Sequence, residues 1–196
     1  MNQHVHDPYV IKAKHEGWRS RAVFKLIEVD EKDRLFKPGM TVVDLGCTPG
    51  SWCEYAVKRI QPGGCLIGLD LLPMEPIPGV QFIQGDFRED EPLARLVEAL
   101  NGRQVDLVLS DMAPNMTGIA VSDQARGMYL AELTLAFAKD HLKPGGSLLT
   151  KVFQGSSYMD LRKEVMELFE ELVVRKPAAS RDRSAETYLL ARNKRV

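Results

Sequence analysis

Residues 41–52 read TVVDLGCTPGSW, and this stretch decides the fold. A β-branched start followed by apolar residues predicts a short buried strand of a parallel sheet. The loop between Gly46 and Gly50 turns sharply, and Ser51 is placed to cap a helix over residues 51–60. Strand, loop and helix N-terminus together form a cradle whose backbone N–H groups face a ligand. The alternative is a glycine turn that merely joins a strand to a helix.

The residues between the two glycines narrow the choice of ligand. Cys47, Thr48 and Pro49 are bulkier than the middle glycine of a dinucleotide fingerprint, and Pro49 lacks an N–H donor. We therefore expect a ligand without a pyrophosphate, such as S-adenosylmethionine. A nicotinamide-dependent dehydrogenase would share the sheet but would need a loop that accommodates a pyrophosphate.

Length and composition predict one domain over residues 1–196. The chain is 44% hydrophobic and 27% charged, which suffices for a sizeable core. No stretch approaches the ~20 apolar residues of a membrane span. Cys47, Cys53 and Cys65 have neither zinc-site spacing nor the even count of a disulfide framework. We expect a reduced, cytoplasmic monomer with no metal site and no membrane partner.

The net charge of −1 hides an uneven distribution. Residues 9–25 hold five basic residues against one acidic, and residues 175–195 hold seven against two, whereas residues 26–174 hold 14 against 23. Basic ends around an acidic body fit a polyanionic partner, with Tyr9 and Trp18 available to stack on bases. Residues 1–20 are therefore expected to form a flexible or RNA-contacting segment. Solvated charge at two chain ends is the alternative.

Strand and helix patterns alternate along the chain, which predicts an open α/β sheet with helices on both faces. Residues 9–19 are expected to be irregular or loosely helical. Further strands are predicted at 65–69, 80–83, 105–110, 147–153, 172–175 and 187–191. Further helices are predicted at 21–34, 91–101, 122–141 and 157–170.

Five strands in succession end in polar residues, and ligands of such sheets bind beyond the carboxyl ends of the parallel strands. These residues are Asp44, Asp70, Asp86, Asp111 and Lys151. One acidic strand end is often a turn or cap residue. Five that converge on one edge indicate a site.

From Tyr9 onward the chain resembles the FtsJ-like family of ribosomal-RNA ribose 2′-O-methyltransferases. The resemblance rests on many short motifs in one order. They are RSRA at 19–22, FKL at 24–26, VDLG at 43–46, PG at 49–50 with Trp52, DLLPM at 70–74, QGDF at 84–87, SDMAPN at 110–115, KVFQG at 151–155 and RKP at 175–177. The chain departs from the family pattern at Cys47, Thr48 and Ser51, where the family often has smaller residues.

The resemblance implies a Rossmann-like, S-adenosylmethionine-dependent methyltransferase fold with a seven-stranded, mostly parallel sheet whose last strand is antiparallel. Such a strand starts at the edge where its parallel neighbours end, so Glu186 can join the site. The family's catalytic set falls on Lys25, Asp111, Lys151 and Glu186. Its cofactor contacts, together with the first glycine of the loop, fall on Gly46, Gly50, Trp52, Asp70, Asp86 and Asp111.

The implied reaction is methyl transfer to a ribose 2′-hydroxyl of RNA. Lys151 is the expected general base, Asp111 would orient it, and Glu186 would hold Lys25 or the ribose. Alternatively, Lys151 orients the hydroxyl while water takes the proton. The implied target is a uridine in the A-loop of large-subunit ribosomal RNA, within the large ribosomal subunit or a late precursor. Transfer RNA, a messenger cap, or a non-catalytic role in ribosome assembly are the alternatives.

Overall fold

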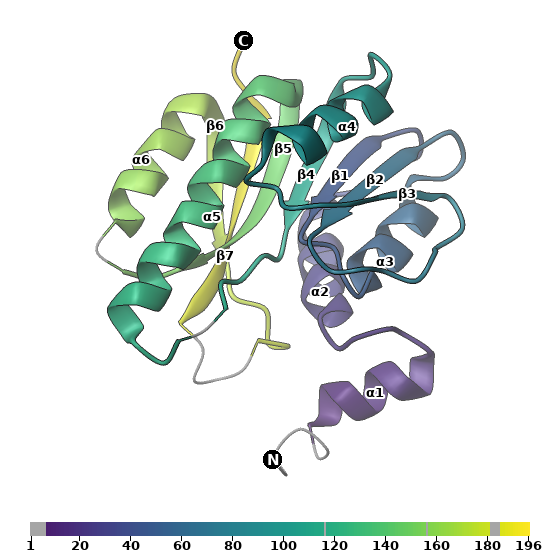
Figure 1. Cartoon of the computed structure of the whole chain (residues 1–196), viewed down its shortest axis with the longest axis horizontal. Helices are drawn as coiled ribbons and strands as arrows, with labels where there is room; N and C mark the ends of the chain where they lie inside the picture. The colour runs from purple at the N-terminus through teal and green to yellow at the C-terminus, as the bar shows by residue number, and fades with distance from the viewer. Residues whose placement is uncertain (1–6, 116, 156, 181–184) are drawn as a thin grey trace.

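Seven strands form one sheet in the part of the chain that the computed structural model describes, residues 7–115, 117–155, 157–180 and 185–196. The strand order is β3-β2-β1-β4-β5-β7-β6 (Figure 1). The strands are β1 (Thr41–Leu45), β2 (Cys65–Asp70), β3 (Val80–Gln84), β4 (Val105–Ser110), β5 (Leu142–Phe153), β6 (Phe169–Arg175) and β7 (Glu186–Lys194). Neighbouring strands pair in parallel except that β7 runs antiparallel to both β5 and β6. The predicted fold class is confirmed.

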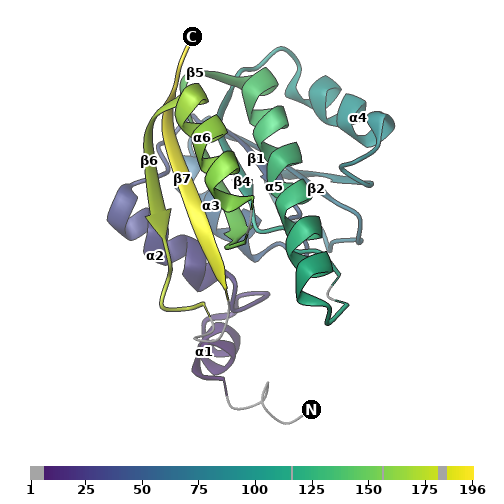
Figure 2. The same ribbon diagram turned by 90° about the vertical axis from the view of Figure 1, so that its left-hand side faces the viewer.

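Helices cover both faces of this sheet (Figure 2). On one face, α2 (Val23–Asp33) and α3 (Ser51–Ile60) pack against the central strands. The other face carries α4 (Asp90–Leu100), α5 (Ala120–His141) and α6 (Tyr158–Leu168). In β1, Val42 joins the first of these cores and Val43 the second, because successive side chains of a strand point to opposite faces. Every residue of β1 is buried, as the apolar run in the sequence predicted.

The N-terminal segment contains a helix that the sequence reasoning left undefined. In α1 (Pro8–Glu16), the Asp7 carboxylate accepts a hydrogen bond from the backbone N–H of Tyr9, and Gly17 ends the helix in the left-handed conformation. Figure 1 shows α1 beyond one end of the sheet, next to the start of α2. His4 and His6 lie outside the described residues, as do Arg181 and Arg183 of the basic segment at residues 175–195.

Several predicted boundaries were wrong. Gly50 is the N-cap of α3, and Ser51 lies inside the helix with its hydroxyl 2.7 Å from that of Ser20. Strand β6 begins at Phe169, where a helix was predicted to continue, because the buried Phe169 side chain packs into the core under the sheet. Pairing with β4 lengthens β5 backward through residues 142–146, whereas the strand was predicted to begin at residue 147.

Candidate active site

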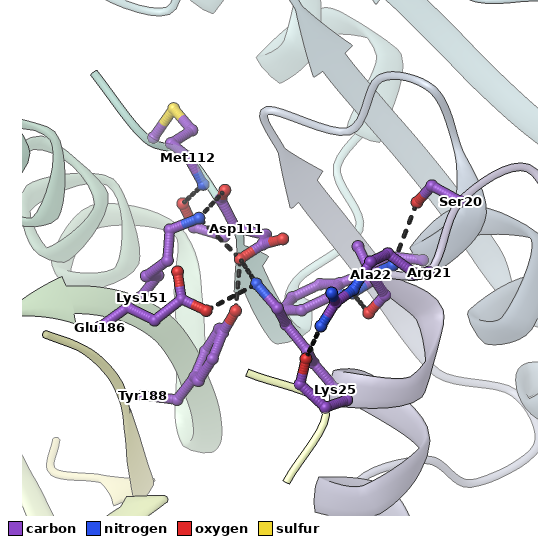
Figure 3. A network of polar contacts seen from close by, with 12 residues as sticks. Ser20, Arg21, Ala22, Lys25, Asp111, Met112, Lys151, Glu186 and Tyr188 are labelled. Atoms are coloured by element: carbon purple, nitrogen blue, oxygen red, sulfur yellow. Dashed lines mark hydrogen bonds and ion pairs between the residues drawn. The ribbon is translucent and has the colours of Figure 1, made fainter. Parts of the chain in front are cut away.

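Four charged residues from four different elements meet at the carboxyl end of β4 and β5 (Figure 3). Lys25 lies in α2, Asp111 follows β4, Lys151 lies in β5, and Glu186 begins β7. The Lys25 ammonium is 2.9 Å from the Glu186 carboxylate and 3.9 Å from Asp111 Oδ1. Lys151 Nζ donates to Asp111 Oδ1 at 2.9 Å and to the Asp111 carbonyl at 2.8 Å. The structure thus brings together all four residues of the expected catalytic set.

Tyr188 is a fifth member of this cluster, and the sequence reasoning missed it. Its hydroxyl donates to Asp111 Oδ1 at 2.5 Å, and its ring lies 5.7 Å from the Lys25 ammonium. The side chain is fully buried. Tyr188 pairs with Lys151 across the antiparallel strands and lies two residues after Glu186. Two residues apart on a strand share a face, so the predicted role of Glu186 was the signal that could have found Tyr188.

The environment shifts the pKa of two of these groups, Tyr188 and Glu186. Burial raises the pKa of Tyr188 well above its ordinary value, and the neighbouring charges of Asp111 and Glu186 add to this. Burial also raises the pKa of Glu186, but the charge and hydrogen bond of Lys25 outweigh it, so the net shift is downward. Near neutral pH the site therefore holds an ionised Glu186 and a protonated tyrosine hydroxyl. Such a cluster can orient a polar substrate group and move its proton.

A cavity of about 660 Å³ opens beside this cluster. Its lining includes four of the expected cofactor residues, Gly46, Asp70, Asp86 and Asp111. The Asp70 carboxylate accepts the backbone N–H groups of Thr48 and Leu72, each at 2.8 Å, which holds the loops after β1 and β2 together. The lining also includes Arg88 and Arg126, so the cavity offers carboxylates to cations or hydrogen-bond donors and guanidinium groups to an anionic group.

Asp86 is on this cavity but already has a partner. Arg88 Nε lies 2.9 Å from Asp86 Oδ1, and Arg88 Nη2 lies 2.5 Å from Oδ2. These hydrogen bonds hold the pKa of Asp86 below its ordinary value. A ligand group that reaches Asp86 must therefore share the carboxylate with Arg88 or displace the guanidinium.

The remaining expected cofactor residues, Gly50 and Trp52, are not in the lining of this cavity. Trp52 is buried, and its indole N–H donates to the Ala22 carbonyl at 2.8 Å. It borders a second hollow of about 30 Å³, which shares Gly46, Thr48 and Asp111 with the larger cavity. Gly50 adopts φ +104°, and a Cβ there would lie 2.7 Å from Ile77 Cδ1. Cofactor contacts by these two residues remain predictions.

The small hollow also contains Asp44, one of the five strand-end residues, to which the sequence reasoning gave no catalytic or cofactor role. Burial raises the pKa of Asp44 to about 7, and the charges of Asp111 and Asp70 contribute, whereas a hydrogen bond from Cys53 opposes the shift. The Cys53 thiol donates to the carboxylate at 3.2 Å. Asp44 is thus a buried acid that changes charge near neutral pH, directly beneath the glycine loop.

Other expectations can be compared with the described residues. Among them, no group of three His, Cys, Asp or Glu side chains could hold a metal ion, and no helix is long and apolar enough to cross a membrane. The Tyr9 ring packs on Phe24 at a centroid distance of 5.6 Å, and the Trp18 ring packs on Tyr55 at 6.3 Å. Both rings that were expected to be available for bases therefore have packing partners within the protein.

Comparison with known proteins identifies one family. The family model described as FtsJ-like methyltransferase matches residues 18–194. A protein of Dechloromonas aromatica named "Ribosomal RNA large subunit methyltransferase E" is 60% identical over 195 residues, which cover 100% of this chain and 95% of that protein. The protein of the same name from Azoarcus sp. is 58% identical over 190 residues, covering 97% and 93%. A solved structure, described as a ribosomal RNA methyltransferase from Plasmodium falciparum, aligns with TM-score 0.81 and 32% identity, covering 90% of this chain and 98% of that one.

Proposed function

The chain belongs to the FtsJ-like methyltransferase family, and we propose that it transfers a methyl group from S-adenosylmethionine to a ribose 2′-hydroxyl of large-subunit ribosomal RNA. The observation that carries the proposal is the meeting of Lys25, Asp111, Lys151 and Glu186 beside the 660 Å³ cavity. The names of the relatives supply the substrate class. Within it, we propose a uridine of the A-loop, presented by the large subunit or a late precursor to a cytoplasmic, monomeric enzyme.

The residues around the cavity suit S-adenosylmethionine as the methyl donor. The carboxylates of Asp70, Asp86 and Asp111 can accept hydrogen bonds from the hydroxyl and amino groups of the cofactor, and Arg88 and Arg126 in the same lining can face its carboxylate. The loop after β1 has no room for a side chain at position 46, since a Cβ on Gly46 would lie 2.3 Å from Met112 Cγ. Asp70 and Asp86 would hold the nucleoside, and Asp111 and the Gly46 loop the amino-acid end. When bound, this cofactor supplies an activated methyl group.

Lys151 is the group we propose to handle the proton of the 2′-hydroxyl. Two of the positions around its tetrahedral nitrogen are used by the hydrogen bonds to Asp111, which leaves a third for the hydroxyl. As a neutral amine, Lys151 presents a lone pair there and takes the proton. As an ammonium, it presents an N–H that orients the hydroxyl while water takes the proton. General acid–base catalysis of this kind contributes typically 10²- to 10⁴-fold to the rate.

The other residues hold Lys151 and the substrate in place. Asp111 fixes Lys151 through two hydrogen bonds, and Tyr188 fixes Asp111. Lys25 lies between two carboxylates, so Glu186 and Asp111 together set the position of its ammonium. Orientation matters because alignment of reacting groups alone can account for several kcal/mol of a reaction barrier.

The test is to map the methylated nucleotide. The purified protein is incubated with tritiated S-adenosylmethionine and with large subunits from cells that lack this gene, and naked large-subunit RNA and transfer RNA serve as parallel substrates. We expect one labelled ribose, on an A-loop uridine, with large subunits as the preferred substrate. Label on transfer RNA or on a base would contradict the proposed target, and absence of label from every RNA would favour a non-catalytic assembly role.

A further inference from the structure

Arg19 belongs to the sequence motif at residues 19–22, to which the proposed mechanism assigns no role. It lies between α1 and α2, and its guanidinium contacts three backbone carbonyls and one carboxylate. Arg19 Nη1 donates to the Pro49 carbonyl at 3.2 Å and to the Glu75 carbonyl at 2.6 Å, and Nη2 donates to the Pro76 carbonyl at 2.9 Å. Its Nε donates to Glu54 at 3.1 Å. One side chain thus connects segments that are 30 to 57 residues away along the chain.

The two loops that Arg19 connects both line the candidate cofactor cavity. The loop after β1 contributes Gly46 and Thr48 to the lining, and the last residue of β2 and the first of the following loop contribute Asp70 and Leu71. At the cavity the loops are joined by Thr48, through its bonds to Asp70 and to the Leu72 carbonyl. Arg19 joins them a second time, at Pro49 on one side and at residues 75–76 on the other. The fork geometry of a guanidinium, with donors in one plane, suits the bridging of several fixed acceptors.

The rest of the motif attaches the same segment to the start of α3. The Ser20 hydroxyl lies 2.7 Å from the Ser51 hydroxyl, and the Ala22 carbonyl accepts the Trp52 indole N–H at 2.8 Å. Lys25 of the catalytic cluster follows three residues after Ala22. The segment that carries Lys25 is therefore fastened at three points, to Pro49 of the glycine loop and to Ser51 and Trp52 in the first turn of α3.

We propose that Arg19 is a positioning residue for the methyl donor: it holds the loops after β1 and β2 at the separation that the bound cofactor requires. This rests on the proposed function. The carbonyls that Arg19 contacts lie at the surface, so water can replace the guanidinium when it is removed. The part-buried Glu54 carboxylate keeps the hydrogen bond from the backbone N–H of residue 19. The main loss then appears as loop freedom that cofactor binding must remove.

Direct binding measurements test this. We compare Arg19→Gln and Arg19→Lys with wild type by calorimetric titration of S-adenosylmethionine and S-adenosylhomocysteine, and we measure kcat and the KM for large subunits at saturating cofactor. We expect about tenfold weaker binding of both compounds to either variant, as for loss of hydrogen bonds from a charged group. The kcat at saturation and the KM for the large subunit stay within about twofold of wild type. Lysine fails to restore binding because it lacks the planar fork.

Two control variants distinguish a positioning role of Arg19 from a general effect of removing a charged side chain. Arg103→Gln removes a guanidinium beyond the C-terminus of α4, where it contacts the Leu100 carbonyl at 3.5 Å, and leaves cofactor binding unchanged. Glu54→Gln keeps Arg19 but weakens its carboxylate partner, and we expect a smaller rise in Kd of the same direction. If Arg19→Gln unfolds, Glu54→Gln still gives the test.

The outcomes separate this inference from the proposed function. Unchanged cofactor Kd in Arg19→Gln, or a raised KM for the large subunit alone, overturns the positioning role. Full restoration by Arg19→Lys also overturns it, because charge and not the fork would then be responsible. If wild type binds neither compound, the proposed function itself fails. Wild-type binding with an unaffected Arg19→Gln variant removes only the role of Arg19.

Discussion

Replacement of Tyr188 by phenylalanine tests whether the orientation of Asp111 controls turnover. The change deletes one hydroxyl from a fully buried ring and with it the 2.5 Å hydrogen bond to Asp111 Oδ1. Lys151 still donates to the same oxygen at 2.9 Å, so the carboxylate is not left without a partner. A hydrogen bond to a charged group contributes about 1.5–3 kcal/mol. We expect Tyr188→Phe to lose this amount of stability and about tenfold in kcat, equivalent to about 1.4 kcal/mol of barrier.

The protein contains a matched control for this variant. Tyr55 donates its hydroxyl to Asp30 at 2.7 Å, and Asp30 also keeps a cation, Arg59, at 3.1 Å. Tyr55→Phe therefore deletes the same kind of bond, away from the catalytic cluster. Thermal unfolding and single-turnover methyl transfer are measured for both variants. Each kcal/mol should lower the midpoint by roughly 2–4 °C for a domain of this size.

Tyr188→Phe and Tyr55→Phe are expected to differ in turnover. We expect both variants to lose similar stability and Tyr188→Phe alone to lose turnover, by the same factor from pH 6 to 9. The factor stays constant because the pKa of Tyr188 is raised by burial, which keeps the hydroxyl protonated throughout. Equal turnover of the two variants would refute the view that Tyr188 acts through Asp111.

Two further predictions concern the cradle. Burial raises the pKa of Asp44 to about 7, so the folded protein keeps a proton there that the unfolded chain releases near pH 3.8. The stability that this proton contributes is complete at low pH and is lost as the pH rises toward 7. Asparagine has no such proton to lose, so the stability of Asp44→Asn relative to wild type should rise by about 2 kcal/mol between pH 5.5 and pH 8, measured by urea titration. The same stability difference at both pH values would contradict the assignment of Asp44 as a buried acid. Gly46→Ala puts a Cβ 2.3 Å from Met112 Cγ at φ +76°, so we expect a loss of about 1–3 kcal/mol in stability and weaker cofactor binding by calorimetry; wild-type values for both would show that the loop is not tightly packed.

The alternation of strands and helices and the edge of the sheet that carries the site could be predicted from the sequence. Each parallel strand is a short apolar run that ends in a polar residue, and this pattern places Asp70, Asp86, Asp111 and Lys151 at one edge. Glu186 was placed there through the family resemblance, since the direction of the last strand is not encoded in its local residues. The close contacts of Lys25 with Glu186 and Asp111 then follow from α2 packing beside that edge.

Other features depend on contacts that local patterns do not specify. Tyr188 lies in the predicted last strand and was given no role, although its hydroxyl donates to Asp111. Trp52 follows the glycine loop in sequence, but its position in the first turn of α3 turns it toward Ala22. The partner of Asp86 is Arg88, two residues away, and a sequence pattern cannot distinguish a free carboxylate from a paired one.

The most direct test of the proposed chemistry is the single-turnover rate of methyl transfer by Lys151→Ala, measured at a cofactor concentration set from its own calorimetric Kd. Because Lys151 contacts Asp111 in the cluster and is not among the residues that line the cofactor cavity, we expect transfer to fall by at least about 10²-fold while the Kd stays within about twofold of wild type. A transfer rate near that of wild type would contradict the assignment of Lys151 to the proton of the 2′-hydroxyl.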